Sequence, residues 1–299
     1  MVWVRRLITF SALFIFCWGG SAFSTGIDRA IAQPWDSAST STWSSEASPN
    51  HAQSEIERIK AQGKIIVAMV KQDNPPFFSK SKKGKLFGLD VDLAQSLADS
   101  LGVKVEFLRT PKTFDEVIET VYRGEADLGV SKLARSLPRA QKVLFSQPYL
   151  TFRQALLVNR LQLAKLQATG LSIDQIVKDF RSTIGVYAGS VYVQYAHETF
   201  PKATVVEFAK WSDAVNAVVS GQVTAIFRDE WEVRSIVLIK PELAINLRTI
   251  VLTDTSDTKG IITAWGNRFL ADYTNLYLET KNQHFTTNQL LDLYAKEPS

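Results

Sequence analysis

The sequence predicts an α/β protein with two similar lobes, because one structural motif occurs twice. An amphipathic helix, a glycine and a short apolar strand follow one another in residues 113–132 (TFDEVIETVYRGEADLGVSK) and again in residues 211–229 (WSDAVNAVVSGQVTAIFRD). Each copy follows two short apolar runs that are typical of buried strands. These runs are residues 64–70 and 103–109 in the first half, and 183–189 and 204–210 in the second. Ligands of such sheets bind at the carboxyl ends of the strands, so the sequence predicts a small-molecule site in a cleft between the lobes.

The composition is that of a soluble globular protein and excludes several classes of function. The 299 residues are 45% hydrophobic and 21% charged, which suits one large or two ordinary domains. The net charge of +4, without a cluster of Lys and Arg, argues against a nucleic-acid-binding surface. The single cysteine, Cys17, and three scattered histidines give no metal-ligand spacing. We therefore expect no disulfide, no metal and no cofactor.

The first 32 residues have the pattern of a secretory signal peptide. Two arginines precede an apolar run at residues 7–18, which is too short to span a bilayer comfortably. Small-residue cleavage patterns end at Ser24 and at Ala32, and we expect cleavage after Ala32. An uncleaved membrane anchor is the weaker alternative, because charged residues soon follow the apolar run.

The folded part is expected to begin at residue 55. Residues 33–54 are rich in Ser and Thr, without periodicity, and are predicted to form a flexible linker. A short helix over residues 55–62 ends at Gly63. Lysines and Gly84 at residues 80–85 indicate a hairpin turn. Residues 88–102 form a clear helix, in which leucines recur every four residues. Its first-turn aspartates, Asp90 and Asp92, are explained by the helix dipole.

Polar and aromatic side chains follow the predicted strands where a ligand would bind. The loop after the first strand carries Asn74 and Phe77, with Phe78 beside it, and we expect one of the two rings to pack under the loop. The irregular, basic segment 131–150 follows the next strand. Its Lys132, Arg135 and Arg139 are candidates for binding a carboxylate, although at least one is expected to be a solvated surface charge.

The second half of the chain offers complementary groups. The turn Gly189-Ser190-Val191 opens a helix, whose free N–H groups suit an anion. Asp229 follows the last strand of the second repeat and suits an ammonium group, although a carboxylate there can also simply cap the next helix. Arginine and N–H groups for a carboxylate, with a carboxylate for an ammonium, together describe the recognition of an α-amino acid.

Several segments together resemble the bacterial extracellular solute-binding proteins of the polar amino-acid type, family 3. GLDVDLAQSLADSL (residues 88–101) fits the signature of that family. Other segments follow in the order of the family: NPPF (74–77), GEADLGVS (124–131), PRA (138–140), FSQPY (145–149), IGVYAGS (184–190) and SGQVTAIFRDE (220–230). The resemblance covers residues 55–299.

The resemblance implies a two-lobed fold of the type II periplasmic-binding-protein kind. Lobe 1 would comprise residues 55–152 and 253–299, and lobe 2 residues 153–252, joined by two crossover segments that act as a hinge. Proteins of this family close around a ligand in the periplasm and deliver it to the membrane permease of an ABC importer. The expected partners are thus a small molecule, most simply an amino acid, and a permease, with the binding protein itself a monomer.

The resemblance also assigns roles to single residues. Arg139 matches the carboxylate-binding arginine, Ser190 and Val191 match the turn that also holds that carboxylate, and Asp229 matches the ammonium-binding carboxylate. Asn74 and Phe77 match the loop that covers the ligand side chain.

Three positions depart from the family pattern and leave the identity of the solute open. Ala134 stands where the family has a serine or threonine, a role that Ser131 or Ser136 could take over if the loop is shifted. Asn74 replaces a common aromatic residue, and Val191 replaces a frequent threonine.

Two other functions are consistent with the same fold. One is an enzyme similar to cyclohexadienyl dehydratase, for which Glu230 is the candidate acid. The other is a sensor that reports its ligand to a separate membrane partner. We expect no catalytic residue, because the chain has no cysteine nucleophile in its folded part, no histidine motif and no glycine-rich phosphate loop.

Overall fold

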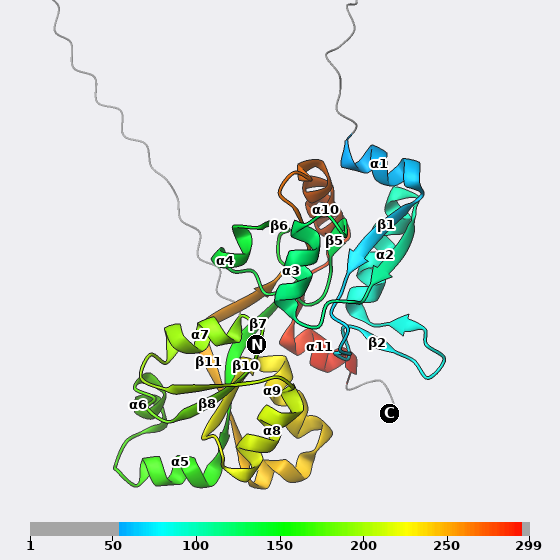
Figure 1. Cartoon of the computed structure of the whole chain (residues 1–299). Coiled ribbons are helices and arrows are strands. Elements are labelled where there is room, and N and C mark those ends of the chain that lie inside the picture. The colour runs from blue at the N-terminus through cyan, green and yellow to red at the C-terminus, as the bar shows by residue number, and fades with distance from the viewer. Residues whose placement is uncertain (1–53, 295–299) are drawn as a thin grey trace, which may run out of the picture. The chain divides into compact units, whose positions relative to one another are not determined.

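The computed structural model describes residues 54–294 (Figure 1). The chain divides into two units, residues 1–50 and residues 51–299, and every described residue belongs to the second unit. The predicted signal peptide and almost all of the predicted linker lie outside the described residues. Within residues 54–294, no helix is both long and apolar enough to cross a membrane.

The first sheet has the strand order β4-β1-β5-β12-β6. Strand β1 pairs in parallel with β4 and β5, and β12 runs antiparallel between β5 and β6. We call this sheet and the helices around it lobe 1. Its elements are α1 (Glu55–Gln62), β1 (Lys64–Ala68), β2 (Ser79–Lys80), β3 (Leu86–Phe87), α2 (Leu89–Leu101), β4 (Lys104–Leu108), α3 (Phe114–Tyr122), β5 (Leu128–Gly129), α4 (Leu137–Ala140), β6 (Val143–Phe145), β12 (Ile262–Ala264), α10 (Arg268–Thr280) and α11 (Thr287–Tyr294).

The second sheet has the strand order β11-β7-β10-β8-β9, and the short β13 also pairs with β7. Strand β8 pairs in parallel with β9 and β10, whereas β7 is antiparallel to β10 and β11. We call this sheet and its helices lobe 2. Its elements are β7 (Leu150–Asn159), α5 (Arg160–Gln167), α6 (Ile173–Lys178), β8 (Thr183–Tyr187), α7 (Tyr192–Thr199), β9 (Thr204–Phe208), α8 (Trp211–Ser220), β10 (Ala225–Asp229), α9 (Glu230–Ile239), the 3-10 helix η1 (Pro241–Ile245), β11 (Leu247–Lys259) and β13 (Phe285–Thr286).

The predicted α/β class and the internal repeat are confirmed by the pairing of the strands. In lobe 1, β1 lies between β4 and β5, and in lobe 2, β8 lies in the same way between β9 and β10. The repeated helices are α3 and α8, and each is followed by the inner strand of its sheet, β5 or β10. The carboxyl ends of β5 and β10 therefore occupy equivalent places in the two lobes.

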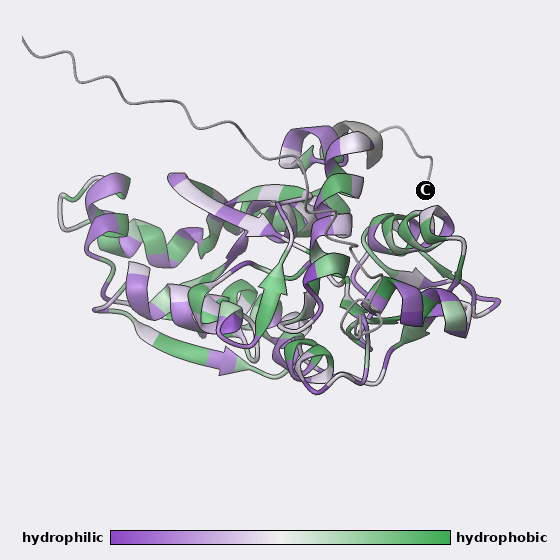
Figure 2. Cartoon of the chain, turned by 90° about the horizontal axis from the view of Figure 1, so that it is seen from above, coloured by the Kyte–Doolittle hydropathy of each residue, from purple (hydrophilic) through white to green (hydrophobic). Residues whose placement is uncertain are grey.

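Hydrophobic cores lie on the sheets of both lobes. In lobe 2, neighbouring strand residues point to opposite faces: Leu156 and Val158 pack with α6 and α7, and Leu157 and Ile226 pack with α8. Strands that are buried on both faces read as continuous apolar runs, which explains why the sequence shows them without alternation. In Figure 2, several strands are coloured as hydrophobic and the helices are partly hydrophilic.

The two segments that the sequence predicts as crossovers lie side by side. Strands β7 and β11 form a long antiparallel ladder, which continues until Lys259 pairs with Leu150 (Figure 1). The register shifts between Leu252 and Asp257. The lobe boundaries predicted near residues 152 and 252 fall inside these two strands.

Some local predictions are wrong. The segment 131–150 is not irregular throughout, because it contains α4 and β6. The sequence predicts one apolar stripe along α10 that includes Phe269, Leu270, Tyr273, Leu276 and Tyr277. However, Phe269 and Leu276 are exposed by 65% and 58%, since only the side with Leu270 and Tyr277 faces the core. Both rings of the 77–78 pair are fully buried, rather than one.

Candidate functional site

Two neighbouring cavities lie between residues of lobe 1 and residues of lobe 2. The large cavity has a volume of about 430 Å³, and its lining includes Asn74 and Phe78 from lobe 1 and Trp211 from lobe 2. The small cavity has a volume of about 20 Å³. Phe114 and Arg228 line both cavities. The large cavity is within the size range of small-molecule sites, whereas the small cavity has room for about one water molecule.

The small cavity brings together most of the predicted site residues. Its lining includes Ala134, Arg139, Ser190, Val191 and Asp229. These residues come from three separate stretches of sequence, so their meeting is a property of the fold.

The remaining predicted residues lie elsewhere. Asn74 lines the large cavity. Phe77 and Ser131 are fully buried and line neither cavity, nor does Ser136, which begins α4. The Ser131 hydroxyl accepts a hydrogen bond from the Val70 N–H at 3.1 Å, so it holds β1 to the loop after β5.

Each nitrogen of the Arg139 guanidinium has a partner in lobe 1. It lies in α4, where its Nε and Nη2 donate to Asp115 Oδ1 at 3.1 and 2.8 Å. Its Nη1 donates to the Ala134 carbonyl at 3.1 Å. The guanidinium thus contacts the small cavity, but every nitrogen already has a partner.

The turn before α7 brings lobe 2 close to lobe 1. Gly189 has φ +65°, and a Cβ at this position would lie 2.8 Å from Thr113 Cβ. Only glycine combines this conformation with such a close approach. The Ser190 hydroxyl donates to the Tyr187 carbonyl at 2.6 Å, so the hydroxyl holds its own turn.

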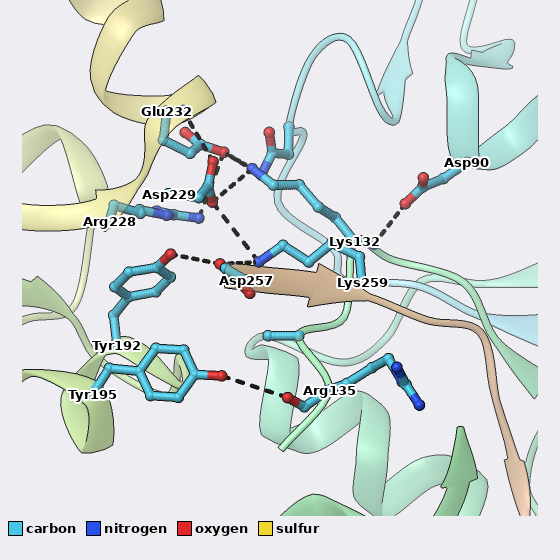
Figure 3. Close-up of polar contacts among 12 residues, drawn as sticks. Asp90, Lys132, Arg135, Tyr192, Tyr195, Arg228, Asp229, Glu232, Asp257 and Lys259 are labelled. Atoms are coloured by element: carbon cyan, nitrogen blue, oxygen red, sulfur yellow. Dashed lines mark hydrogen bonds and ion pairs between the residues drawn. The ribbon is translucent and has the colours of Figure 1, made fainter. Parts of the chain in front are cut away.

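Asp229 is already paired with a lysine ammonium. Its Oδ2 lies 3.2 Å from Lys132 Nζ and 4.0 Å from Lys259 Nζ (Figure 3). Its Oδ1 accepts from the Glu232 N–H at 3.1 Å, which caps α9. The capping role that the sequence suggested and a place in the site therefore coexist. The position expected for a ligand ammonium is occupied by the protein's own Lys132.

Lys132 links the lobes through a buried ion pair. Its Nζ donates to Glu232 Oε1 at 2.6 Å, and Asn74 Nδ2 donates to the same oxygen at 3.0 Å. Burial opposes ionisation of Glu232, but Arg228 and Lys132 outweigh it and lower the pKa of Glu232 to about 2. The Lys132 ammonium also lies 4.6 Å above the centre of the Phe77 ring. The Phe77 ring thus stabilises the Lys132 cation by a cation–π contact.

Lys259 has a partner of its own on β11. Its Nζ donates to Asp257 Oδ2 at 2.5 Å, and the Tyr192 hydroxyl donates to the same oxygen at 2.5 Å. Burial lowers the pKa of Lys259, while it raises the pKa of Tyr192 well above its ordinary value. Like Lys132, Lys259 is held in place by the protein itself.

Arg228 differs from the other buried cations. Its side chain is only 5% exposed, and its guanidinium lies over the rings of Trp211, Tyr187 and Phe114, at 4.8, 5.1 and 5.9 Å from their centres. The nearest carboxylate oxygen is Glu232 Oε1, at 3.7 Å. The guanidinium makes no hydrogen bond to any residue in 54–294. Aromatic rings contact the guanidinium but accept no conventional hydrogen bond from it, so its N–H groups stay available.

A buried carboxyl group shapes the loop that carries Lys132. Asp90 Oδ2 accepts from the Lys132 N–H at 2.6 Å, and Asp90 Oδ1 accepts from the Tyr149 hydroxyl at 3.0 Å. These contacts hold Lys132 at φ +49°, which is unusual for a residue other than glycine. Burial raises the pKa of Asp90 to about 7. The helix dipole alone, which was our explanation of Asp90, is therefore insufficient.

Sequence reasoning misjudged the surroundings of three basic residues and missed Arg228 as a residue of the site. None of Lys132, Arg135 and Arg139 is a solvated surface charge: Lys132 and Arg139 are buried, and Arg135 is half-buried with its guanidinium pointing away from the cluster (Figure 3). Arg228 could have been found, because it follows the apolar residues TAIF within one predicted strand. A charged residue in such a run needs a reason to be buried.

The described residues hold no candidate metal cluster, and the candidate acid lies away from both cavities. Among residues 54–294, no cluster of three His, Cys, Asp or Glu side chains could hold a metal ion. Glu230, the candidate acid, pairs with Arg234 at 2.7 Å and accepts from Thr287 Oγ1 at 3.3 Å. Glu230 lines neither cavity.

Curated relatives include both binding proteins and an enzyme. The arginine-binding periplasmic protein of Mannheimia haemolytica is 28% identical, over 57% of this chain and 65% of that protein. An ABC transporter glutamine-binding protein of Bacillus subtilis is 30% identical, over 62% of this chain and 65% of its own. Cyclohexadienyl dehydratase of Pseudomonas aeruginosa is 26% identical, over 66% of this chain and 70% of that protein. The chain thus spans about two thirds of the length of these relatives.

Solved structures show the same fold over most of the chain. An ancestral amino acid-binding protein, a precursor of cyclohexadienyl dehydratase, matches with a TM-score of 0.64 and 29% identity, over 81% of this chain and 99% of its own. A substrate-binding protein of an amino acid ABC transporter from Streptococcus pneumoniae, bound to L-arginine, matches with a TM-score of 0.63 and 26% identity. That match covers 79% of this chain and 96% of the other. The family model of the bacterial extracellular solute-binding proteins, family 3, matches residues 66–235. The chain belongs to this family.

Proposed function

We propose that this protein captures an amino acid or a related small solute between its two lobes and delivers it to an ABC importer. The observation that carries the proposal is the large cavity of about 430 Å³, lined by residues of both lobes in a member of a solute-binding family. Lobe 1 contributes the loop around Asn74 together with Phe114, and lobe 2 contributes Trp211, Arg228 and residues along the length of α9. A ligand that contacts both lobes favours the closed arrangement, because it binds that arrangement more tightly.

The proposed location is the periplasm, and the proposed partner is the permease of an importer. Support comes from relatives that are described as periplasmic or as components of ABC transporters. We propose secretion through a cleaved signal peptide, two lobes with the boundaries given above, and hinge closure at the paired segments of β7 and β11. The protein acts as a monomer in this proposal.

Binding without catalysis fits the site better than a dehydratase does. Glu230, the candidate acid, is paired with Arg234 and Thr287. Each carboxylate that lines a cavity is paired as well: Asp229 and Glu232 with Lys132, and Asp73 with Arg109. The measurement that separates the two functions is incubation with prephenate and arogenate. Turnover of either compound would contradict the binding role.

The proposed function is tested by calorimetric titration of the purified protein with amino acids and small organic acids, after removal of any copurified solute by unfolding and refolding. We expect saturable binding of at least one member. Trp211→Ala is expected to weaken that binding by about tenfold, since Trp211 lines the cavity. The matched control is Trp265→Ala, because Trp265 is 48% exposed and lines neither cavity. Absence of binding across the panel would refute the proposal.

The transport step needs a separate measurement. Cells that lack this protein should lose high-affinity uptake of the solute identified by calorimetry. Unchanged uptake, with binding intact, would favour the sensor role.

A further inference from the structure

The small cavity has no free group for a ligand ammonium. Asp229, the expected acceptor, is 1% exposed and has Lys132 Nζ at 3.2 Å and Lys259 Nζ at 4.0 Å. Lys132 comes from the end of β5 in lobe 1, so it reaches Asp229 from the opposite side of the cleft. A second ammonium placed beside the same carboxylate would have to approach two buried lysine cations, and like charges at this distance repel strongly in a poorly solvated site.

Six buried charged residues around Asp229, which we call the cluster, balance one another without a ligand. Lys132, Lys259 and Arg228 face Asp229, Glu232 and Asp257, three cations against three carboxylates. Four of these six groups make a close ion pair of 2.6 Å or less, and Asp229 adds its 3.2 Å contact with Lys132. Arg228 is the exception, because its one ion-pair partner within residues 54–294 lies at 3.7 Å. The cluster thus leaves two capacities unused: the donors of Arg228 and the buried acceptor Asp257 Oδ1. Of these two residues, only Arg228 lines the cavities.

Arg228 has the geometry of a preformed site for a carboxylate. The rings of Trp211, Tyr187 and Phe114 surround its guanidinium and hold it in place, and the residue lines both cavities. A guanidinium fixed in this way presents parallel N–H groups to a planar oxyanion. Exposure of 4% means that solvent reaches few of these donors. The same aromatic rings provide an apolar wall for the body of a ligand.

We propose that the solute is recognised as a carboxylic acid by Arg228 in the large cavity, and that an α-ammonium group adds nothing to its affinity, because Lys132 takes the place of that group beside Asp229. This inference rests on the proposed function and narrows it to a ligand class: small organic acids with an apolar or planar body, including deaminated relatives of amino acids. Arg139 and Asp229, which the resemblance assigns to a zwitterion, are structural in this proposal.

Matched sets of three compounds test the ligand class. Each set contains an amino acid, the same molecule without its α-amino group, and the same molecule without its carboxylate. Suitable sets are phenylalanine, 3-phenylpropanoate and 2-phenylethylamine; glutamine, glutaramate and 4-aminobutanamide; and arginine, 5-guanidinopentanoate and agmatine. Dissociation constants are measured by calorimetry on the purified protein after removal of copurified solute.

In every set of which at least one compound binds, we expect the dissociation constants of the acid and the amino acid to agree to within about threefold. The amine of that set is expected to bind at least about a hundredfold more weakly than the acid. An amino acid that binds at least about tenfold more tightly than its deaminated partner would overturn the inference but leave the proposed function intact. If no compound of any set binds, both the inference and the proposed function fail.

Variants of two arginines test the assigned residue. Arg228→Met is expected to weaken binding of the acid by about thirtyfold or more, since it removes the charged donor and keeps the volume of the side chain. Arg153→Met is the matched control, because Arg153 is exposed on β7 and lines neither cavity. Equal affinity of Arg228→Met and wild type, with both folded by circular dichroism, would overturn the assignment.

A third variant tests the role of Lys132. Lys132→Met leaves Asp229 without its nearest cation, so the ratio of amino-acid affinity to acid affinity is expected to rise by about tenfold or more. An unchanged ratio in the folded variant would show that Lys132 does not stand in for a ligand ammonium. If this variant does not fold, the compound sets and Arg228→Met still decide the proposal.

Discussion

Arg139 and Arg228 are both buried arginines that line the small cavity, but their surroundings differ. Arg139 donates from three nitrogens to Asp115 and to the Ala134 carbonyl, all within lobe 1. Arg228 lies among three aromatic rings and has no hydrogen bond within residues 54–294. The comparison teaches that a position in a family motif shows where a side chain lies, whereas its remaining hydrogen-bonding capacity decides whether it can bind a ligand.

The largest effect is expected when the carboxylate beside Arg228 is removed. Glu232 receives Lys132 and Asn74 and lies near Arg228, so Glu232→Gln leaves two buried cations undercompensated. We expect the free energy of unfolding to fall by about 3 kcal/mol, measured by urea denaturation. Glu230→Gln is the comparison, because its partner Arg234 is 42% exposed and the loss should be clearly smaller. Equal losses would show that burial of the cation partners is unimportant.

A change in pH should act through the loop that carries Lys132. The pKa of Asp90 is about 7 in the folded protein and 3.8 ordinarily, so between these values the folded state holds a proton that the unfolded state has lost. Stability should therefore fall as the pH rises through this window. Asp90→Asn cannot ionise and should flatten the dependence of the melting temperature on pH. Asp92→Asn, at an exposed neighbour, serves as the control and should keep the wild-type slope.

Removing the paired arginine should matter less for binding than removing the stacked one. Arg139→Met takes away a guanidinium that has three partners of its own, so we expect solute affinity to fall by about fivefold or less, measured by calorimetry. A loss as large as that in Arg228→Met would restore Arg139 as the main carboxylate-binding residue and erase the contrast.

The smallest effect on stability and binding is expected when Arg139 is kept and its partner Asp115 is changed. Asp115→Asn removes its charged partner, whose side chain is 57% exposed, so the loss of stability should stay below about 1 kcal/mol. If the contrast between the two arginines depends on hydrogen-bonding capacity, this variant should bind organic acids slightly more tightly than wild type does. Weaker binding would count against that explanation.

Much of the fold could be predicted from the sequence, because its signals are local. The apolar runs and the helix–glycine–strand motif identified β1, β4, β8 and β9, and the regular leucines identified α2. The short α4 and β6 were missed, since four-residue and three-residue elements carry too little periodicity. The exposure of Phe269 and Leu276 was missed because apolar composition alone does not say which side of α10 meets the core.

The charges of the site were harder to predict than its position. The motifs led to the segments around Arg139, Ser190 and Asp229, and the structure brings those segments together at one small cavity. The pairing of Lys132 with Asp229 and Glu232 joins positions about a hundred residues apart in the chain, across two lobes. Sequence spacing contains no information about which of many charged residues will meet in this way, so the occupied state of Asp229 could be seen only in the structure.

Gly189 allows the backbones of the two lobes to approach each other closely. The backbone there comes so near to Thr113 that a single methyl group would have no room. In the proposed closure, the separation of the lobes is therefore set by the absence of one side chain, at a position far from Arg228 in the sequence. A spacer of one carbon atom at this point would hold the lobes apart and speed the escape of any solute without altering a group that touches it. The proposed function thus assigns residence time and chemical selectivity to different places in the chain.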